Sequence, residues 1–285
     1  MINKITVRLV GGLGNQLFIY AFGLATARKA GKELVIDDLS GFGHRDIYRA
    51  KFCLNAFYLK ETLLSNSKYK YFVANRYFWA LARKLGLSYV EKDDSKYNAE
   101  ATAGKSLFFE GYWQSYLYFH EFKRIIKSNL QLINKDDPKI SAYKKQILNS
   151  KNSVAIGMRF YESFPGDEQR YSIKNDSYYS KAIDLVESNK KNLTYFVFSM
   201  NIERAKSELA FHDDKNIIFV NPLMSLTDAS LDMYLMSLCD HFIISNSTMY
   251  WWAAYLGEAD DSLVVAPEAG LSNKDALLPH WIKLR

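Results

Sequence analysis

Residues 5–18 read ITVRLVGGLGNQLF, and this stretch points to the fold class. Apolar residues at positions 5, 7 and 9 alternate with polar ones, which predicts a β-strand. A turn rich in glycine follows at 11–14, and apolar residues then recur at helical spacing from Asn15 until Gly31. A second apolar run at 34–36 predicts another strand. Strand, turn, helix and strand together form a βαβ unit.

The second half of the chain repeats this alternation. Apolar runs predict buried strands at 154–158, 194–198, 217–220, 242–244 and 263–266. Amphipathic patterns predict helices at about 120–131, 138–150, 178–188, 201–211, 230–238 and 248–256. Buried strands that alternate with helices are typical of doubly wound parallel sheets. We therefore expect two α/β domains, residues 1–150 and 151–285, facing each other across a ligand-binding cleft.

Composition excludes several classes of protein. The 285 residues are 48% hydrophobic and 24% charged, which excludes a disordered chain. The net charge of +6 suits an anionic partner without singling out nucleic acid. Cys53 and Cys239 lie far apart and predict neither a disulfide nor a metal site, so a reducing compartment is expected. With no signal-peptide pattern at the start and no long apolar run, we expect a cytoplasmic protein.

The segment 60–90 combines basic and aromatic residues. It holds six Lys or Arg residues against one acid, Glu61, with tyrosines and phenylalanines interleaved. One interpretation is an amphipathic helix that contacts a membrane surface. The favoured alternative is a solvated basic face over a buried aromatic stripe.

Ligands of open α/β sheets bind at the carboxyl ends of the strands. In the first half these ends carry residues 11–16 and then Asp37 and Asp38. The glycine turn is not a dinucleotide fingerprint, because Leu17 stands where the third glycine would fall. It is equally compatible with a structural turn and with a ligand-binding loop.

In the second half, the strand ends carry polar residues suited to an anion. Residues 245–248, Ser-Asn-Ser-Thr, precede a predicted helix, whose amino terminus could bind a phosphate or could simply be capped by a hydroxyl. Arg159 ends an apolar strand, where either a carboxylate or an anionic ligand would compensate its charge. Residues 199–201 and 221–222 follow two other strands.

Metal-dependent chemistry finds no support in the sequence. No Asp-x-Asp triplet occurs, and the five histidines lack metal-ligand spacing. We therefore expect neither a metal nor another cofactor.

Several segments in this order resemble one known family. They are 11–18 with 20–21, 110–115, 232–239, 244–248 with 251–252, 265–267 and 279–283. The chain resembles the bacterial α-1,2-fucosyltransferases of glycosyltransferase family 11. The resemblance implies a GT-B-type fold with two Rossmann-like domains, of which the C-terminal one binds GDP-fucose and the N-terminal one the acceptor. It also implies inverting, metal-independent transfer of L-fucose to the 2-hydroxyl of a galactose residue in an O-antigen acceptor. Such an acceptor is expected to be lipid-linked, at the inner face of the inner membrane.

The chain departs from the family in a loop and in a motif. The loop that usually reads Phe-Ser-Asp-Asp is Phe-Ser-Met-Asn at 198–201. The family's His-x-Arg-Arg-x-Asp reads Gly-Met-Arg-Phe-Tyr-Glu at 157–162, which keeps Arg159 but replaces the second arginine by Phe160. GDP-colitose or another GDP-deoxysugar is therefore an alternative donor, and a non-catalytic GDP-sugar binder is a further alternative.

Roles for individual residues follow as expectations. Arg159 is expected to stabilise the departing phosphate, and the candidates for a general base are Asp37, Asp38, His44 and Glu162. The expected donor-binding residues are Gly12, Gly14, Asn15, Arg159, Ser199, Asn201, Ser245, Asn246, Ser247 and Thr248. The expected acceptor-binding residues are Asp38, Trp113 and Gln114, although Trp113 fits equally well in a core.

Overall fold

The structure is a computed structural model that describes residues 3–42, 51–103, 106–160, 177–212, 214–221, 229–268, 271 and 273–284. Two compact units make up the chain, Met1–Ile133 with Ser272–Leu278, and Asn134–Leu271 with Pro279–Arg285. The second unit thus begins before the helix expected at 138–150 rather than after it, because that helix packs on α10 (Ala229–Ser237). No helix among the described residues is long and apolar enough to cross a membrane.

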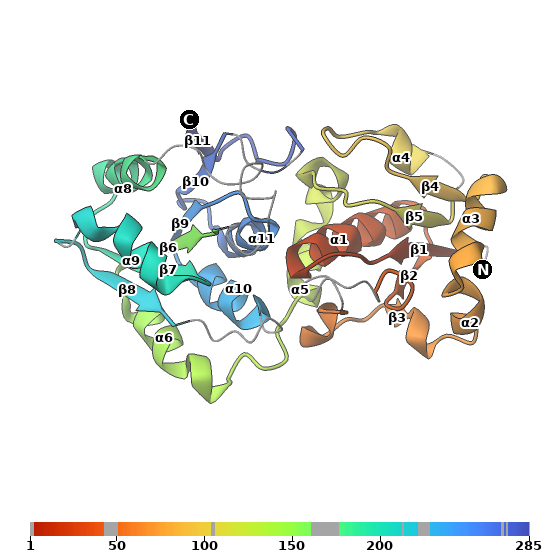
Figure 1. Cartoon of the computed structure of the whole chain (residues 1–285), viewed down its shortest axis with the longest axis horizontal. Coiled ribbons are helices and arrows are strands. Elements are labelled where there is room, and N and C mark those ends of the chain that lie inside the picture. Colours follow the sequence, from red (N-terminus) through yellow and green to blue (C-terminus); the bar gives the residue numbers. More distant parts are fainter. Residues whose placement is uncertain are drawn as a thin grey trace. The chain divides into compact units, whose positions relative to one another are not determined.

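The first unit contains a five-stranded parallel sheet (Figure 1). Its order is β3-β2-β1-β5-β4. The strands are β1 (Lys4–Arg8), β2 (Glu33–Asp37), β3 (Thr62–Leu63), β4 (Ser88–Val90) and β5 (Phe108–Glu110). Its α-helices are α1 (Leu13–Lys29), α2 (Lys70–Val73), α3 (Arg76–Lys84), α4 (Glu100–Ala103) and α5 (Lys123–Asn129). Short 3₁₀ turns lie at Leu54–Ala56, Leu64–Asn66, Tyr116–Tyr118 and His120–Phe122.

Alternating side chains of β5 show how helices cover both faces of this sheet. Phe108 packs edge-to-face against Trp79 of α3, with ring centroids 5.8 Å apart. Phe109, on the opposite face, packs against Phe22 of α1 at 5.3 Å. Gly23 lets α1 approach the sheet closely, because a Cβ there would lie 2.6 Å from the side chain of Val7.

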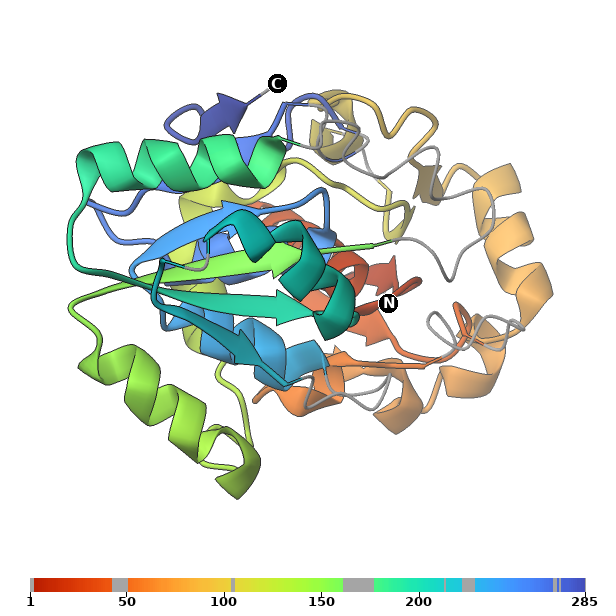
Figure 2. The same ribbon diagram turned by 60° about the vertical axis from the view of Figure 1, so that its left-hand side comes forward.

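The second unit contains a six-stranded parallel sheet in the order β11-β10-β9-β6-β7-β8 (Figure 2). Its strands are β6 (Asn152–Met158), β7 (Leu193–Ser199), β8 (Ile217–Val220), β9 (His241–Ile244), β10 (Val264–Pro267) and β11 (Ile282–Leu284). Its helices are α6 (Pro138–Asn149), α8 (Tyr178–Asn189), α9 (Ile202–Glu208), α10, α11 (Thr248–Gly257) and the 3₁₀ turn Ala210–His212. This is the strand order of the Rossmann fold, and it reverses between β6 and β9. The strands and helices predicted for this half are confirmed, and among the described residues only the strand β11 was missed.

Side chains of β6 again separate two helical layers. Ile156 and Met158 belong to a core cluster with α8 and α9. Gly157 faces the other layer, where the ring of Tyr250 in α11 would lie 2.6 Å from an added Cβ. The glycine at this position thus makes room for an aromatic ring directly against the strand.

Candidate functional site

The point where the strand order of the second sheet reverses brings Arg159 and Ser245 together. Arg159 follows β6 and Ser245 follows β9, the adjacent strand. The backbone N–H of Arg159 donates to the Ser245 hydroxyl at 3.2 Å, and the N–H of Ser245 donates to the carbonyl of Gly157 at 3.1 Å. Two residues 86 positions apart therefore meet at the edge where doubly wound sheets bind ligands.

The Arg159 side chain is half-buried beside the end of β7. Its Nη1 lies 2.9 Å from the sulfur of Met200, which is a weak acceptor. The next residue, Phe160, packs its ring under the guanidinium of Arg204, 4.4 Å from the ring centroid. Where the family motif has a second arginine, this chain thus offers an aromatic ring that holds an arginine from α9.

Helix α11 begins at this same edge. Ser247 occupies the N-cap position in an extended conformation, and its side chain makes no capping hydrogen bond. Ser247 and Thr248 are half-buried, whereas Ser245 and Asn246 are buried. The first N–H groups of a helix lack intrahelical acceptors and attract anions. This terminus therefore suits a phosphate better than the simple capped start that the sequence also allowed.

The loop after β7 is used mainly in local contacts. The Ser199 hydroxyl accepts from the N–H of Asn201 at 3.1 Å, and the Asn201 side chain caps α9 by accepting from the N–H of Arg204 at 3.0 Å. Ser199 pairs with Met158 in the sheet, so the loop lies beside Arg159. Its expected donor-binding role remains a prediction.

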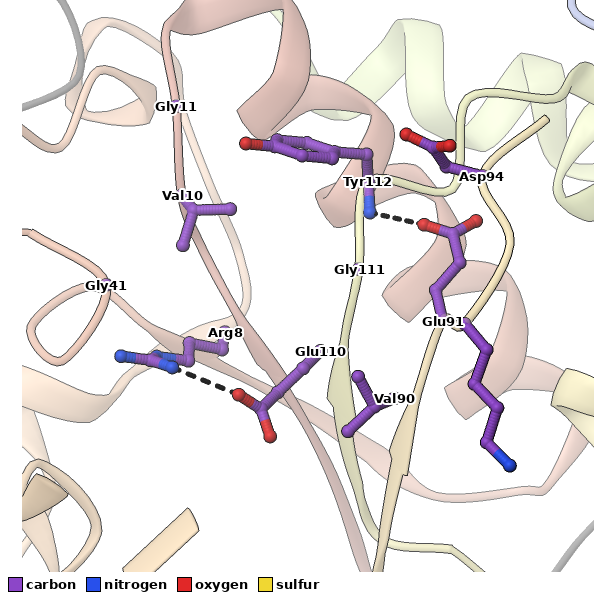
Figure 3. Close-up of a pocket in the computed structure, with 11 residues that line it drawn as sticks. Arg8, Val10, Gly11, Gly41, Val90, Glu91, Asp94, Glu110, Gly111 and Tyr112 are labelled. Carbon is purple, nitrogen blue, oxygen red and sulfur yellow. Dashed lines mark hydrogen bonds and ion pairs between the residues drawn. The ribbon is translucent and has the colours of Figure 1, made fainter. Parts of the chain in front are cut away.

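A cavity of about 660 Å³ lies at the carboxyl ends of β1, β4 and β5 in the first unit (Figure 3). Arg8, Val10, Gly11, Gly41, Val90, Glu91, Lys92, Asp94, Glu110, Gly111 and Tyr112 line it. Figure 3 shows Arg8 and Glu110 pointing toward each other, and their ion pair measures 3.0 Å. The Nε of Arg83 lies 3.1 Å from the other oxygen of Glu110.

Glu91 shapes the wall of this cavity. Its Oε2 accepts from the backbone N–H groups of Tyr112 at 2.6 Å and of Trp113 at 3.0 Å. Trp113 has a φ of 55°, in the left-handed region, so these two bonds hold an unusual backbone in place. Burial raises the pKa of Glu91, and the nearby carboxylates of Asp94 and Asp93 raise it further.

The structure corrects the expected role of Trp113. Its side chain is completely buried and stacks on Phe22 with ring centroids 3.9 Å apart, which makes it a core residue. Its neighbour Tyr112 is the aromatic residue that lines the cavity. The sequence identified the right motif, but the left-handed backbone at Trp113 decides which ring lines the cavity. The ring of Tyr112 lines it, whereas the ring of Trp113 lies in the core.

The turn at 11–16 serves both structure and site. Gly11, with a φ of 78°, lines the cavity, while Gly12 is the N-cap of α1 and Gly14 is buried in its first turn. Gln114 donates to the Asn15 side chain at 3.0 Å, which brings together two of the expected binding residues.

Two of the expected bases are engaged in local structure. The buried Asp37 carboxylate accepts from the N–H groups of Leu39 and Ser40, at 3.0 and 2.8 Å, and from the Ser40 hydroxyl. Burial raises the pKa of Asp37, but both its oxygens hold the turn after β2, which contradicts a role as base. Asp38 is half-buried and accepts from the N–H of Ser65 at 2.9 Å.

The other two expected bases, His44 and Glu162, lie outside the described residues. Within the described part of the chain, no group of three His, Cys, Asp or Glu side chains is placed to hold a metal ion. Independence from metals stays a prediction.

Comparison with known proteins decides the family. The family model described as "Glycosyl transferase family 11" matches residues 2–285. The chain belongs to glycosyltransferase family 11. It is 29% identical to the O-antigen biosynthesis glycosyltransferase WbnK of Escherichia coli, over 97% of this chain and 99% of that protein. It is 27% identical to an alpha-1,2-colitosyltransferase of Escherichia coli, over 98% of each.

The fold is also shared with a solved structure. A crystal structure of NodZ alpha-1,6-fucosyltransferase soaked with GDP-fucose matches with a TM-score of 0.52 and 14% identity, covering 89% of this chain and 92% of NodZ. This likeness supports a GT-B-type fold with two Rossmann-like units, as the sequence predicts. The family match and the two named relatives, rather than this fold likeness, make the protein a glycosyltransferase.

Proposed function

We propose that the protein transfers L-fucose from GDP-fucose to the 2-hydroxyl of a galactose residue in an O-antigen acceptor, with inversion and without a metal. The observation that carries this proposal is the junction of Arg159, Ser245 and the start of α11 in the second unit. A guanidinium and the N–H groups of the first turn of a helix offer the hydrogen-bond donors that a diphosphate needs. NodZ, which shares the fold, has a crystal structure soaked with GDP-fucose.

The reaction proposed is a single displacement. The acceptor oxygen forms a bond to the anomeric carbon while the bond from that carbon to the phosphate oxygen breaks. The electron pair leaves with GDP, and the hydroxyl proton passes to a base or to water. Arg159 and the N–H and hydroxyl groups at 247–248 would stabilise the charge that grows on the β-phosphate. Loss of one such preorganised donor typically lowers the rate by about 10²–10³.

We assign the acceptor to the cavity in the first unit. Its volume of about 660 Å³ suits a small saccharide. The ring of Tyr112 offers an apolar face for a sugar ring, and the carboxylates of Glu91, Asp94 and Glu110 can accept hydrogen bonds from hydroxyl groups. Tyr112 takes the role expected of Trp113, and Gln114 supports the cavity through Asn15.

Two alternatives to this donor and activity stay open to test. One similar relative is named for colitose, and the second arginine of the family motif is Phe160 here, so GDP-colitose or another GDP-deoxysugar is the second candidate donor. Because that motif is altered, a non-catalytic GDP-sugar binder is the third candidate.

The setting proposed is the cytoplasmic face of the inner membrane. The acceptor would be lipid-linked, as the O-antigen relative suggests, and peripheral contact through 60–90 would bring the enzyme to it. No role in nucleic-acid binding is proposed.

The test measures release of GDP with a chelator present. Purified protein receives GDP-fucose, GDP-colitose or GDP-mannose, each with a panel of β-galactosides, and the product linkage is determined by NMR. We expect release that depends on GDP-fucose and on the acceptor, and a 1,2-linked product. The variant Arg159→Ala should lose about 10²–10³ in turnover, whereas Arg124→Ala, an exposed arginine on α5, should not. Release that depends on GDP-colitose alone would favour the second donor. Binding of GDP-fucose without release of GDP from any of the donors would refute the transferase and favour the binder.

A further inference from the structure

Helices α2 and α3 lie at one edge of the first unit (Figure 1). Five large apolar side chains on or next to these helices are exposed, and we call them the apolar ridge: Tyr71, Phe72, Tyr77, Leu81 and Leu85. Between 50% and 83% of each residue is exposed. Exposed large apolar residues occur elsewhere among the described residues, but here five of them lie within fifteen positions. Such a concentration of exposed apolar side chains is typical of an interaction site.

The fold itself does not require the ridge. Trp79 and Ala82 form the inner side of α3 and are buried in a cluster with Val35 and Phe108. Residues 77, 81 and 85 repeat every four positions, so they lie together on the outer side of the helix. This helix therefore has two apolar sides, of which only one is used by the core.

The two helices that carry the ridge pack against each other. The rings of Phe72 in α2 and Phe78 in α3 meet edge-to-face with centroids 4.9 Å apart. Phe78 in turn contacts Phe108 of β5 at 4.9 Å. Helices α2 and α3 are thus packed onto the sheet through Phe78.

Positive charge surrounds the ridge. Lys68 and Lys84 are exposed, and the Nζ of Lys70 lies 5.1 Å from the centre of the Tyr71 ring. Glu61, the single acid of the segment 60–90, is turned inward, where its carboxylate accepts from the hydroxyl of Tyr20 at 3.1 Å. Within the segment 60–90, the charged side chains beside the ridge are therefore basic.

We propose that the ridge and its lysines bind an anionic phospholipid surface. Tyrosine and leucine side chains would enter the interface between headgroups and acyl chains, and the lysines would contact phosphate groups. A second copy of the chain fits this surface poorly, because a two-fold contact would place lysines against lysines. This inference deepens the proposed function by naming the surface and the lipid chemistry, and its test requires neither donor nor acceptor.

The test is co-sedimentation of the full chain with vesicles of phosphatidylglycerol or of phosphatidylcholine. A ridge variant carries Leu81→Ser and Leu85→Ser, and a charge variant carries Lys68→Gln, Lys70→Gln and Lys84→Gln. The matched controls are Phe211→Ser, which changes an exposed aromatic residue of the second unit, and a triple glutamine variant of three other exposed lysines, Lys139, Lys145 and Lys181.

We expect the wild type to bind phosphatidylglycerol vesicles and to lose that binding in high salt. The charge variant should bind on the order of 100-fold more weakly, since each lysine near an anionic surface contributes about fivefold. Each serine should weaken binding by about tenfold. The controls should bind like the wild type.

Equal binding to both kinds of vesicle, or wild-type binding by both ridge and charge variants, would overturn the proposal. A wild-type protein that binds neither kind of vesicle would also overturn the proposal. If the wild type is a dimer in solution and the ridge variant is a monomer, the ridge is instead the contact surface for a second copy of the chain. None of these results depends on the sugar that the enzyme transfers.

Discussion

Replacing Asp232 by asparagine should stabilise the second unit at neutral and alkaline pH but not in acid. Asp232 lies in α10 and is only 6% exposed, and one of its carboxylate oxygens has no hydrogen-bond partner among the described residues. Burial raises its pKa from 3.8 to about 7. The folded state thus keeps the carboxyl protonated at a pH where the unfolded chain has released the proton.

The sign of the pH dependence follows from this difference. Between pH 3.8 and pH 7 the folded state binds more protons than the unfolded state, so the free energy of unfolding falls as pH rises. A shift of about three units corresponds to about 4 kcal/mol, at 1.4 kcal/mol for each unit. Asparagine fills the same space and never ionises. Compared with wild type, Asp232→Asn should therefore gain up to about 4 kcal/mol above pH 7 and nothing near pH 4.

The assay is amide hydrogen exchange of β6 and β7, because the two units can unfold separately and a whole-chain melt would mix them. Protection is measured at several pH values after correction for the intrinsic exchange rate. The control is Asp184→Asn, an exposed aspartate of α8, which should give no pH-dependent gain. The same stability difference at pH 4 and pH 8 would show that Asp232 is ionised in the folded protein, and it would refute the argument from burial.

Three further predictions concern the sites. Tyr112→Ala should raise the KM for the acceptor about tenfold or more, while Tyr112→Phe keeps it and the rate of GDP-fucose hydrolysis without acceptor stays unchanged in both. Trp113→Ala should instead lower stability by about 3–5 kcal/mol, seen in urea unfolding of the first unit. Gly157→Ala should cost about 1–3 kcal/mol in urea unfolding of the second unit, because its Cβ would meet the Tyr250 ring, and adding Tyr250→Leu should restore part of the loss.

The two halves of the chain differ in how well their sequences predict structure. In the second half, the strands β6 to β10 have four to seven residues each and are nearly unbroken apolar runs, because helices cover both faces of their sheet. In the first half β3, β4 and β5 have only two or three residues each, too few for a pattern to show. The segment 60–90 illustrates the same limit. Its aromatic stripe was expected to be buried, yet Trp79 is buried while Tyr71 and Tyr77 are exposed.

The candidate site shows which functional residues can be predicted from a position at the end of a strand. Arg159 and Ser245 could be predicted, because each follows a long buried strand and the strands prove to be neighbours. Glu91 could not, since it follows the three-residue strand β4, and only the pairing of Val90 with Glu110 brings it to the cavity.

A position at a strand end also does not tell whether a polar group is available to a ligand. Asp37 stands at such an end as Arg159 does, but the turn after β2 uses both its oxygens. The same holds for Trp113, whose ring is turned into the core by a left-handed backbone that Glu91 stabilises. Sequence periodicity locates the edge of a sheet, whereas the hydrogen bonds of the following turn decide which side chains there remain for chemistry. Exchange of Asp37 for asparagine should accordingly disturb the turn and its Arg8 contact, and should leave the pH profile of turnover unchanged.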